Sequence, residues 1–301
     1  MISYLITVFV QAAIYALFSL GLNLQWGIGG LVNFGHVAFI TIGAYAVALL
    51  TRTGGLPWAV AVLVGVGLGI LLALLVGLTT LRLREDYLAI VTIGIAEIVR
   101  LITNNEEWLT QGTRGVFGYQ IPFLGFVSPE KYNFLFALGL VITIGFIVWQ
   151  LEWLIRSPWG RVLKAIREDE MVATALGKNV FVYKLQAFIF GGAIAAVAGA
   201  FLAWYLKAIY PTTFTALMTF EAWTIVAIGG AGNNLGVLVG ALFYQFYTTI
   251  PRFLPTAVKQ ALGGGRIEAI QVILIGLTLM AIMVWRPQGL LGKKAELSLR
   301  R

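Results

Sequence analysis

The sequence predicts an all-α, polytopic membrane protein with about eight transmembrane segments. Apolar residues make up 59% of its 301 residues and charged residues only 11%, whereas about 25% of the residues of soluble domains are charged. So few charged side chains could not cover the surface of a water-soluble fold. The apolar residues also gather in stretches of about 17 or more, the length that a helix needs to cross a lipid bilayer.

Seven stretches are expected to be single spans, and an eighth is interrupted. The seven are Tyr4–Trp26, Asn33–Leu50, Pro57–Leu81, Tyr87–Asn104, Tyr132–Ile155, Leu185–Leu206 and Ile267–Trp285. The eighth, Glu221–Thr249, carries glycines and asparagines at its centre. Small residues are expected to permit close helix packing, among them Gly65, Gly67, Gly69, Gly191, Gly192 and Gly199.

The distribution of Lys and Arg predicts which segments face the cytoplasm, because cytoplasmic loops carry an excess of these residues. Six lie in the linker 156–184, five in the tail 286–301, and two, Arg82 and Arg84, in a short turn. We therefore interpret residues 1–301 as one transmembrane domain with a cytoplasmic linker, 156–184, and a basic cytoplasmic tail, 286–301. The C-terminus is then cytoplasmic.

This orientation constrains the interrupted stretch. Leu185–Leu206 leaves the cytoplasm and Ile267–Trp285 returns to it, so Glu221–Thr249 cannot cross the membrane once. It is expected to be re-entrant or a pair of short helices. Gly-rich breaks survive at membrane depth only where protein or a wet cavity satisfies the freed backbone groups.

A short internal repeat points to a second break. Ile28–Gly35 resembles Ile228–Gly236, and each copy leads into a helix that contains Gly-Ala. Duplicated halves with interrupted helices are typical of transporters; chance recurrence in a glycine-rich chain is the alternative. We expect interrupted or re-entrant helices at residues 27–36 and 229–236.

Polar side chains at the breaks and in one span are candidates for a solute pathway. They are Asn33 and His36 at the first break, Asn233 and Asn234 at the second, and Glu97 within a span. The amides and the imidazole either hydrogen-bond a passing solute or hold the helix ends, since asparagine is a common N-cap. Glu97 either borders the pathway or forms an internal ion pair with Arg100, three residues further along the helix.

Several chemistries are excluded. The chain has no cysteine, which excludes disulfides and thiolate metal sites, and its single histidine, His36, excludes a multi-histidine metal site. No Gly-x-x-x-x-Gly-Lys-Ser/Thr phosphate loop is present. The basic residues lie in loops and at the C-terminus without a recognition motif, so nucleic acid is not an expected partner. We expect no catalytic residue, no metal ligand and no cofactor bound by this chain.

The cytoplasmic linker predicts two short helices. Pro158 starts the first, and Val162, Leu163 and Ile166 give it an apolar face at helical spacing. An acidic trio, Glu168–Glu170, precedes the second helix, which Gly177 is expected to end. The apolar face is suited to a groove on a partner protein; a helix lying on lipid headgroups is the alternative.

The linker also carries a family resemblance, on Gly160-Arg161, Ala165–Glu170, Leu176-Gly177 and Tyr183–Leu185. These residues resemble the coupling loop of permeases from bacterial ABC importers of branched-chain amino acids. Similar segments follow in order along nearly the whole chain, namely Tyr15–Leu17, Leu20–Leu24, Asp86–Thr92, Gly229-Gly230 and Pro287–Gly292. The first two of them, together with Trp26-Gly27, Gly30-Leu31 and Phe34–His36, resemble the first segment of that family's M-type permease. The wider importer family has the pattern Glu-Ala-Ala-x-x-x-Gly. This chain has Glu170 but Met171 and Val172 in place of the two alanines, and its spacing to Gly177 is longer.

The resemblance implies a permease subunit of an ATP-driven importer of branched-chain or other neutral amino acids in the bacterial inner membrane. It implies a second homologous permease, two cytoplasmic ABC ATPases that use ATP and Mg²⁺, and a periplasmic solute-binding protein. The residues expected to couple to the ATPases are Arg161, Leu163, Ile166, Arg167, Glu168, Asp169, Glu170 and Gly177. The alternatives are a urea or amide ABC permease, an ion-coupled secondary carrier and a passive amide channel.

Overall fold

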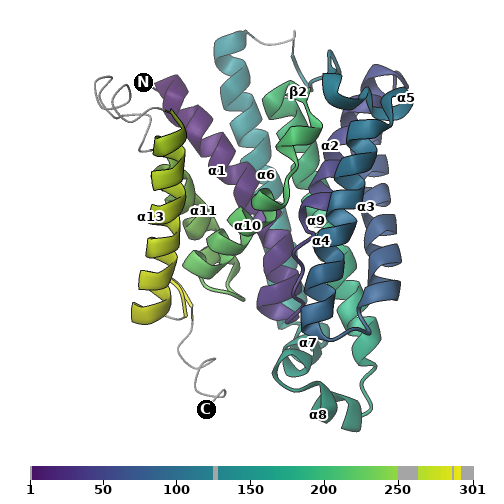
Figure 1. Ribbon diagram of the computed structural model, residues 1–301, viewed down its shortest axis with the longest axis vertical. Helices are drawn as coiled ribbons and strands as arrows, with labels where there is room; N and C mark the ends of the chain where they lie inside the picture. Colours follow the sequence, from purple (N-terminus) through teal and green to yellow (C-terminus); the bar gives the residue numbers. More distant parts are fainter. Residues whose placement is uncertain (1, 125–127, 250–263, 287, 293–301) are drawn as a thin grey trace.

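The computed structural model describes residues 2–124, 128–249, 264–286 and 288–292, and this part of the chain is almost entirely helical (Figure 1). The long helices are α1 (Ile2–Leu22), α2 (Val37–Arg52), α3 (Trp58–Thr80), α4 (Glu85–Asn105), α6 (Pro129–Arg156), α9 (Val180–Leu206), α10 (Ala216–Gly229), α11 (Asn234–Thr249) and α13 (Gly264–Trp285). The short elements are the π-helix η1 (Asn23–Ile28), α5 (Glu107–Thr110), the 3-10 turns η2 (Gly112–Arg114) and η3 (Pro211–Thr213), α7 (Pro158–Glu168), α8 (Glu170–Ala175), and the strands β1 (Val116–Phe117) and β2 (Ala208–Ile209). Five helical segments within the described residues are long and apolar enough to cross a membrane. The prediction of an all-α, polytopic membrane protein is confirmed.

Helix α9 lies at the centre and packs against α1, α2 and α3. Glycines make this approach possible, because a methyl group at Gly199 would stand 2.2 Å from the carbonyl oxygen of Ile40, and one at Gly43 would stand 2.1 Å from that of Ala196. The backbones of α2 and α9 are therefore in direct contact. Gly67 differs from its prediction: a methyl group there would meet no atom within 4 Å, so this residue faces outward from α3.

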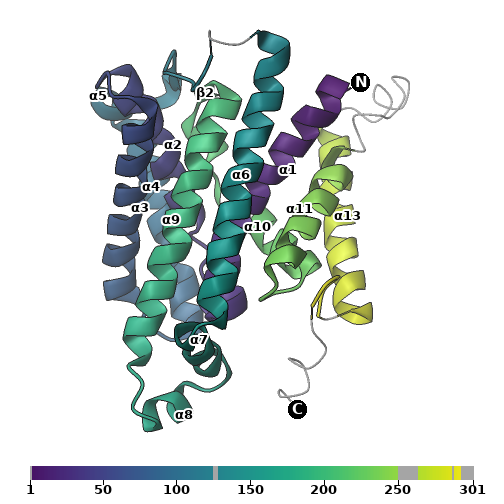
Figure 2. The same cartoon turned by 180° about the vertical axis from the view of Figure 1, so that it is seen from behind.

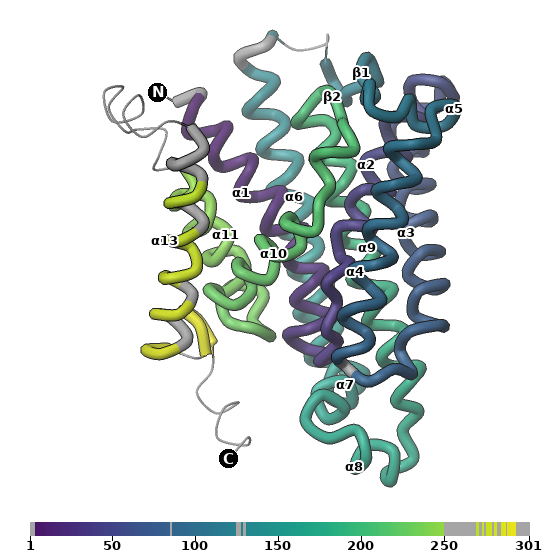
Figure 3. The backbone as a smooth tube through the Cα atoms, viewed as in Figure 1, coloured from purple at the N-terminus to yellow at the C-terminus, as the bar shows by residue number. Residues whose placement is uncertain are grey.

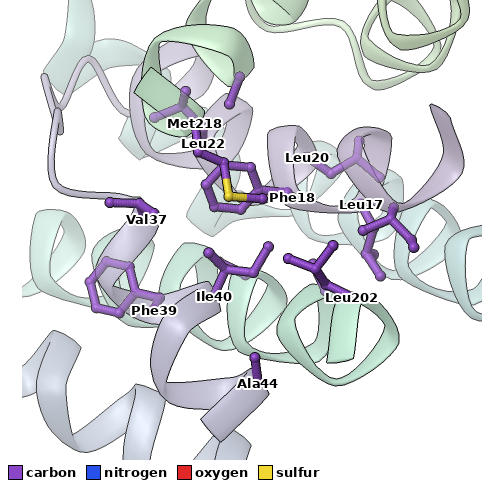
Figure 4. Close-up of a cluster of buried hydrophobic side chains, with 14 of the residues drawn as sticks. Leu17, Phe18, Leu20, Leu22, Val37, Phe39, Ile40, Ala44, Leu202 and Met218 are labelled. Atoms are coloured by element: carbon purple, nitrogen blue, oxygen red, sulfur yellow. The ribbon is translucent and has the colours of Figure 1, made fainter. Parts of the chain in front are cut away.

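The apolar core lies between α1, α2, α9 and α10. Phe18 is fully buried and lies near Leu22, Ile40 and Met218 (Figure 4). The outer helices instead expose apolar side chains, such as Leu63 of α3, which is 72% exposed. Helices α1 and α9 therefore form the interior of the bundle, whereas α3 and α6 lie at its outside.

Two short helices replace a single span at the interrupted stretch, as predicted. Helix α10 ends at Gly229, α11 begins at Asn234, and the two lie side by side (Figure 3). A methyl group at Gly229 would stand 2.1 Å from the carbonyl oxygen of Gly236. Helix α10 begins at Ala216, ahead of the expected start of this stretch.

The two ends of the bundle carry different elements. At one end β1 and β2 pair antiparallel, and α5 and the start of α1 lie at this same end, whereas α7 and α8 lie at the other end (Figures 1 and 2). The start of α1 and the linker are therefore at opposite ends of the bundle. The tail residues 288–292 lie against the α10–α11 break, where the N–H groups of Leu290 and Leu291 donate to the carbonyl oxygens of Ile228 (2.8 Å) and Gly229 (3.1 Å). Residues 287 and 293–301 of the predicted tail lie outside the described residues.

The linker folds into the two short helices that the sequence predicts. Helix α7 begins at Pro158. Asp169 caps α8 by accepting from the N–H groups of Met171 (2.8 Å) and Val172 (3.0 Å), and Gly177 follows with a φ of +74°. Helix α9 begins at Val180, so the last residues of the expected linker, 180–184, belong to a membrane helix.

Candidate functional site

The first break follows η1 and is held by two buried amides. The side-chain amide of Gln25 donates to the carbonyl oxygen of Phe188 on α9 (2.9 Å), and its Oε1 accepts from the amide of Asn33 (2.8 Å). Asn33 Oδ1 in turn accepts from the N–H group of Gly35 (2.8 Å). Gln25 and Asn33 are both fully buried. In this conformation Asn33 holds the turn that leads into α2.

His36 ends the first break and is also fully buried. Its Nε2 lies 3.1 Å from the carbonyl oxygen of Phe18, and the two rings stack with their centroids 4.7 Å apart. A methyl group at Gly21 would stand 3.1 Å from the imidazole Nε2, so α1 passes close to the ring. His36 therefore lies in the core between α1 and α2.

Helix α10 satisfies further groups at this break. Trp223 Nε1 donates to the carbonyl oxygen of Asn33 (3.1 Å), and the N–H group of Val37 donates to Oγ1 of Thr219 (3.0 Å). Protein groups thus replace the hydrogen bonds that a continuous helix would make, which is the condition for a break at membrane depth.

The second break turns on glycine and closes against the tail. Gly230 and Gly232 have φ angles of +110° and +85°, which L side chains rarely adopt. Asn233 Oδ1 accepts from the N–H group of Gly236 (3.2 Å), and its amide donates to the carbonyl oxygen of Leu291 (2.7 Å). Asn233 is partly exposed and links α11 to the tail.

The two breaks meet through a pair of asparagines. Asn23 donates to Oδ1 of Asn234 (3.0 Å), and its own Oδ1 accepts from the N–H group of Gly232 (2.8 Å). The amide of Asn234 then donates to Oε1 of Glu152 on α6 (3.0 Å). The sequence analysis singled out Asn33 at the first break and Asn233 and Asn234 at the second. The contact between the breaks is made by Asn23 and Asn234, and Asn23 was missed as a site residue.

Helix α7 lies directly against the first break. The guanidinium group of Arg167 donates to the carbonyl oxygen of Gly27. A methyl group at Gly30 would stand 3.0 Å from Cγ of Arg167, and one at Gly29 would stand 3.5 Å from Cδ1 of Leu163. The linker is thus in contact with the backbone of the broken helix.

The apolar face of α7 is turned into the protein. Leu163 and Ile166 are 0% and 1% exposed, and α6, α9 and η1 pack against this helix. The expectation that these two side chains are free for a partner is therefore corrected. Helical spacing identifies a buried face but does not identify the surface that covers it.

The exposed apolar side chains of the linker lie on and just after α8. Met171 is 81% exposed, Val172 56% and Leu176 73%, and α8 projects beyond α7 at the end of the bundle (Figure 2). We call these three residues the α8 patch. Exposed acidic side chains flank it, at Glu168, Asp169 and Glu170, and exposed Arg161 lies on the preceding helix.

Residues 4–283 match a protein-family model described as "Branched-chain amino acid transport system / permease component". The match covers nearly the whole chain. The chain belongs to this family. It is therefore a permease component of a transport system and a multi-pass membrane protein.

Curated proteins similar to this permease include two branched-chain amino acid permeases and a nucleoside permease. The probable branched-chain amino acid transport permease protein LivM of Methanocaldococcus jannaschii is 31% identical, over 93% of this chain and 91% of its own length, which confirms the resemblance to M-type permeases. The permease protein LivH of the high-affinity branched-chain amino acid transport system of Escherichia coli is 27% identical, over 93% and 91%. The nucleoside ABC transporter permease protein NupC of Lactococcus lactis is 25% identical, over 81% and 78%. No solved structure matches this permease.

Two carboxylates of this permease differ in their surroundings. Glu97 and Arg100 form the predicted ion pair, with Nε of Arg100 2.8 Å from Oε2 of Glu97, on an exposed surface of α4. Sequence reasoning took Glu97 as the acid inside a span and missed Glu221. Glu221 lies within α10, and its carboxylate interacts with the hydroxyls of Tyr15 on α1 and Tyr244 on α11. The three side chains come from three different helices beside the breaks.

No group of three or more His, Asp or Glu side chains in the described part of the chain could hold a metal ion. The polar groups at the breaks are amides, backbone groups, hydroxyls and the imidazole of His36, with the carboxylate of Glu152 beside Asn234. Such groups can exchange hydrogen bonds with one another or with a small polar solute.

Proposed function

We propose that this permease is one of two translocating subunits in an ATP-driven importer of branched-chain or other neutral amino acids. A second homologous permease completes the membrane part, two cytoplasmic ABC ATPases hydrolyse ATP, and a periplasmic solute-binding protein delivers the amino acid. The family match and the similarity to both LivM and LivH support this proposal. The permease lies in the inner membrane with its linker and C-terminus on the cytoplasmic side, which the Lys and Arg distribution supports.

The observation that carries the proposal is the contact between α7 and the first break. Arg167 is hydrogen-bonded to the carbonyl oxygen of Gly27, and Leu163 packs beside Gly29. A displacement of the linker by the ATPases acts on the broken helix through these contacts. Leu163, Ile166 and Arg167 therefore transmit movement from inside the permease.

The ATPase contact itself is assigned to the α8 patch. Met171, Val172 and Leu176 are exposed on the outermost element of the linker, and a cluster of exposed apolar side chains rimmed by charge is typical of a protein interface. Arg161, Glu168, Asp169 and Glu170 form the polar rim. Gly177, with its positive φ, turns the chain back toward α9.

The pathway opens where the two breaks separate. The bond between Asn23 and Asn234 joins the breaks in this conformation, and its rupture frees amide groups for the polar end of a solute. Asn33, His36 and Asn233 border these breaks and control their geometry. Glu97 lies on an exposed surface of α4, paired with Arg100, and does not reach the two breaks.

A nucleoside is the second candidate solute, and the similarity to the nucleoside permease NupC supports it. Uptake by the reconstituted complex separates the possibilities. Radiolabelled leucine, uridine and urea are offered with and without ATP, and with a proton gradient in place of ATP. ATP-dependent leucine uptake is the expected result. Uptake driven by the gradient alone would mean a secondary carrier, and ATP-dependent uptake of uridine or urea alone would replace the amino acid as substrate.

A further inference from the structure

A groove of about 620 Å³ opens at the linker end of the bundle, away from the two breaks. It lies between the turn that joins α3 to α4, the first residues of α9 and the start of α8. Its charged wall is formed by Arg82 and Arg84 from the turn, Lys184 from α9 and Glu170 from α8, and Phe181 forms its aromatic wall.

The groove carries more positive than negative charge. Lys184 is paired with Glu170, whereas no described acidic side chain pairs with Arg82 or Arg84. The guanidinium carbon of Arg82 lies 5.3 Å from the ring centroid of Phe181, which holds that side chain against the groove wall. Two arginines on one wall match the oxygens of a phosphate group, because guanidinium groups bind phosphate through paired hydrogen bonds.

The surface next to the groove is apolar and faces outward. Leu75 and Leu78 of α3 are 56% and 47% exposed, and Tyr87 and Ile90 of α4 are 60% and 66% exposed. Both helices extend from the turn that carries the two arginines. A ligand with a phosphate headgroup and acyl chains can therefore place the phosphate in the groove and its chains along α3 and α4.

We propose that this groove binds the phosphate headgroup of an anionic phospholipid. Arg82 and Arg84 contact the phosphate, and Phe181 packs against the glycerol backbone. Basic pockets at the ends of membrane helices are suited to such headgroups. The exposed apolar side chains of α3 and α4 next to the groove favour a lipid over a soluble phosphate ester.

The site is linked to the coupling segment through one ion pair. Glu170 is the first residue of α8 and holds Lys184 at the edge of the groove. A bound phosphate competes with the Glu170 carboxylate for Lys184. The position of α8 therefore responds to the lipid beside it.

Native mass spectrometry of the detergent-purified permease tests the proposal. The wild-type protein is mixed with phosphatidylglycerol or phosphatidylcholine, and so is the double variant Arg82→Gln/Arg84→Gln. The control, Lys178→Gln/Arg286→Gln, removes the same charge from exposed positions outside the groove. We expect the wild type and the control to retain phosphatidylglycerol in preference to phosphatidylcholine, and the groove variant to bind phosphatidylglycerol about thirty-fold more weakly.

Three outcomes would overturn the proposal. In the first, the wild type retains the two lipids equally. In the second, the groove variant retains as much phosphatidylglycerol as the wild type. In the third, the groove variant and the control lose phosphatidylglycerol binding to the same extent. Competition with millimolar glycerol 3-phosphate distinguishes a lipid from a free phosphate ester, because displacement at that concentration would contradict a lipid site. The comparison of two lipids on the wild type needs no variant, so the test stands even if the groove variant does not fold.

Discussion

The side-chain amide of Asn23 donates to Oδ1 of Asn234 over 3.0 Å, although 211 positions separate the two residues in the chain. Both side chains are fully buried. Asn23 Oδ1 also accepts from the N–H group of Gly232, and the side-chain amide of Asn234 donates to Oε1 of Glu152. The two interrupted helices are therefore fastened to each other at their breaks, and any movement that separates them must break a buried amide pair.

Removal of either asparagine should destabilise this junction. Asn23→Ala leaves Oδ1 of Asn234 and the N–H group of Gly232 without their partner, and an unsatisfied buried polar group costs about 1–3 kcal/mol. We expect Asn23→Ala and Asn234→Ala each to lower the melting temperature of the detergent-purified protein. The melting temperature of the double variant should fall by less than the sum of the two single falls, because both changes remove the same interaction. Asn105→Ala, at the exposed end of α4, is the control; strict additivity would mean that the pair is not coupled.

The contact between α2 and α9 gives a second prediction. Gly43→Ala places a methyl group 2.1 Å from the carbonyl oxygen of Ala196, and overpacking of this kind costs about 1–3 kcal/mol. Gly67→Ala on α3 meets no atom within 4 Å and should gain slightly from the higher helix propensity of alanine. The melting temperature of Gly67→Ala should therefore equal or exceed that of the wild type, and the melting temperature of Gly43→Ala should be lower. The opposite ranking would mean that α2 and α9 do not touch.

Local sequence features anticipated much of this fold, because their physical causes are local. Pro158 starts α7, Gly177 ends the α8 segment, and the run of glycines after Gly229 interrupts the helix at the expected place. The prediction that Gly67 packs against another helix was wrong, because the sequence shows that a residue is small but does not show which side of the helix it faces. The junction of Asn23 with Asn234 depends on the folding of two distant segments, so no local pattern could locate it.

The topology predicts which positions share a side of the membrane. Helices α10 and α11 return the chain to the side from which it entered, so Thr215 and Thr248 should lie on the side of α5, opposite Lys178. The chain has no cysteine, so single cysteines at these three positions are unique labels. An impermeant maleimide added to intact cells should label Thr215→Cys and Thr248→Cys but not Lys178→Cys. Labelling of only one of the two threonine positions would mean that the stretch crosses once.

The α8 patch predicts where the ATPase binds. Met171→Asp and Leu176→Asp place charge on exposed side chains and should release the ATPase in a pull-down while leaving the melting temperature unchanged. Leu163→Asp instead buries a carboxylate in a fully enclosed site, so it should reduce folded protein, because an unpaired buried charge is strongly disfavoured. Normal ATPase binding by both α8 variants would contradict the assignment of the patch.

The apolar spacing of α7 illustrates a limit of sequence reasoning. Val162, Leu163 and Ile166 form the expected face, yet the permease itself covers Leu163 and Ile166. The exposed side chains Met171 and Val172 occupy the positions where the chain departs from the wider importer pattern. Glu221 was overlooked because it stands at the edge of the interrupted stretch, and only the fold brings Tyr15 and Tyr244 to it.

The most direct measurement is the number of solute molecules imported per ATP hydrolysed, in the reconstituted complex that contains Arg167→Gln. This variant loses the charged hydrogen bond to the carbonyl oxygen of Gly27, and such bonds contribute about 1.5–3 kcal/mol. Lys178→Gln, an exposed change in the same linker, is the control. If α7 transmits ATPase movement to the first break, Arg167→Gln should continue to hydrolyse ATP while its uptake per ATP falls about tenfold or more, and the control should match the wild type. An unchanged ratio of uptake to hydrolysis in Arg167→Gln would contradict the coupling of the linker to the broken helix.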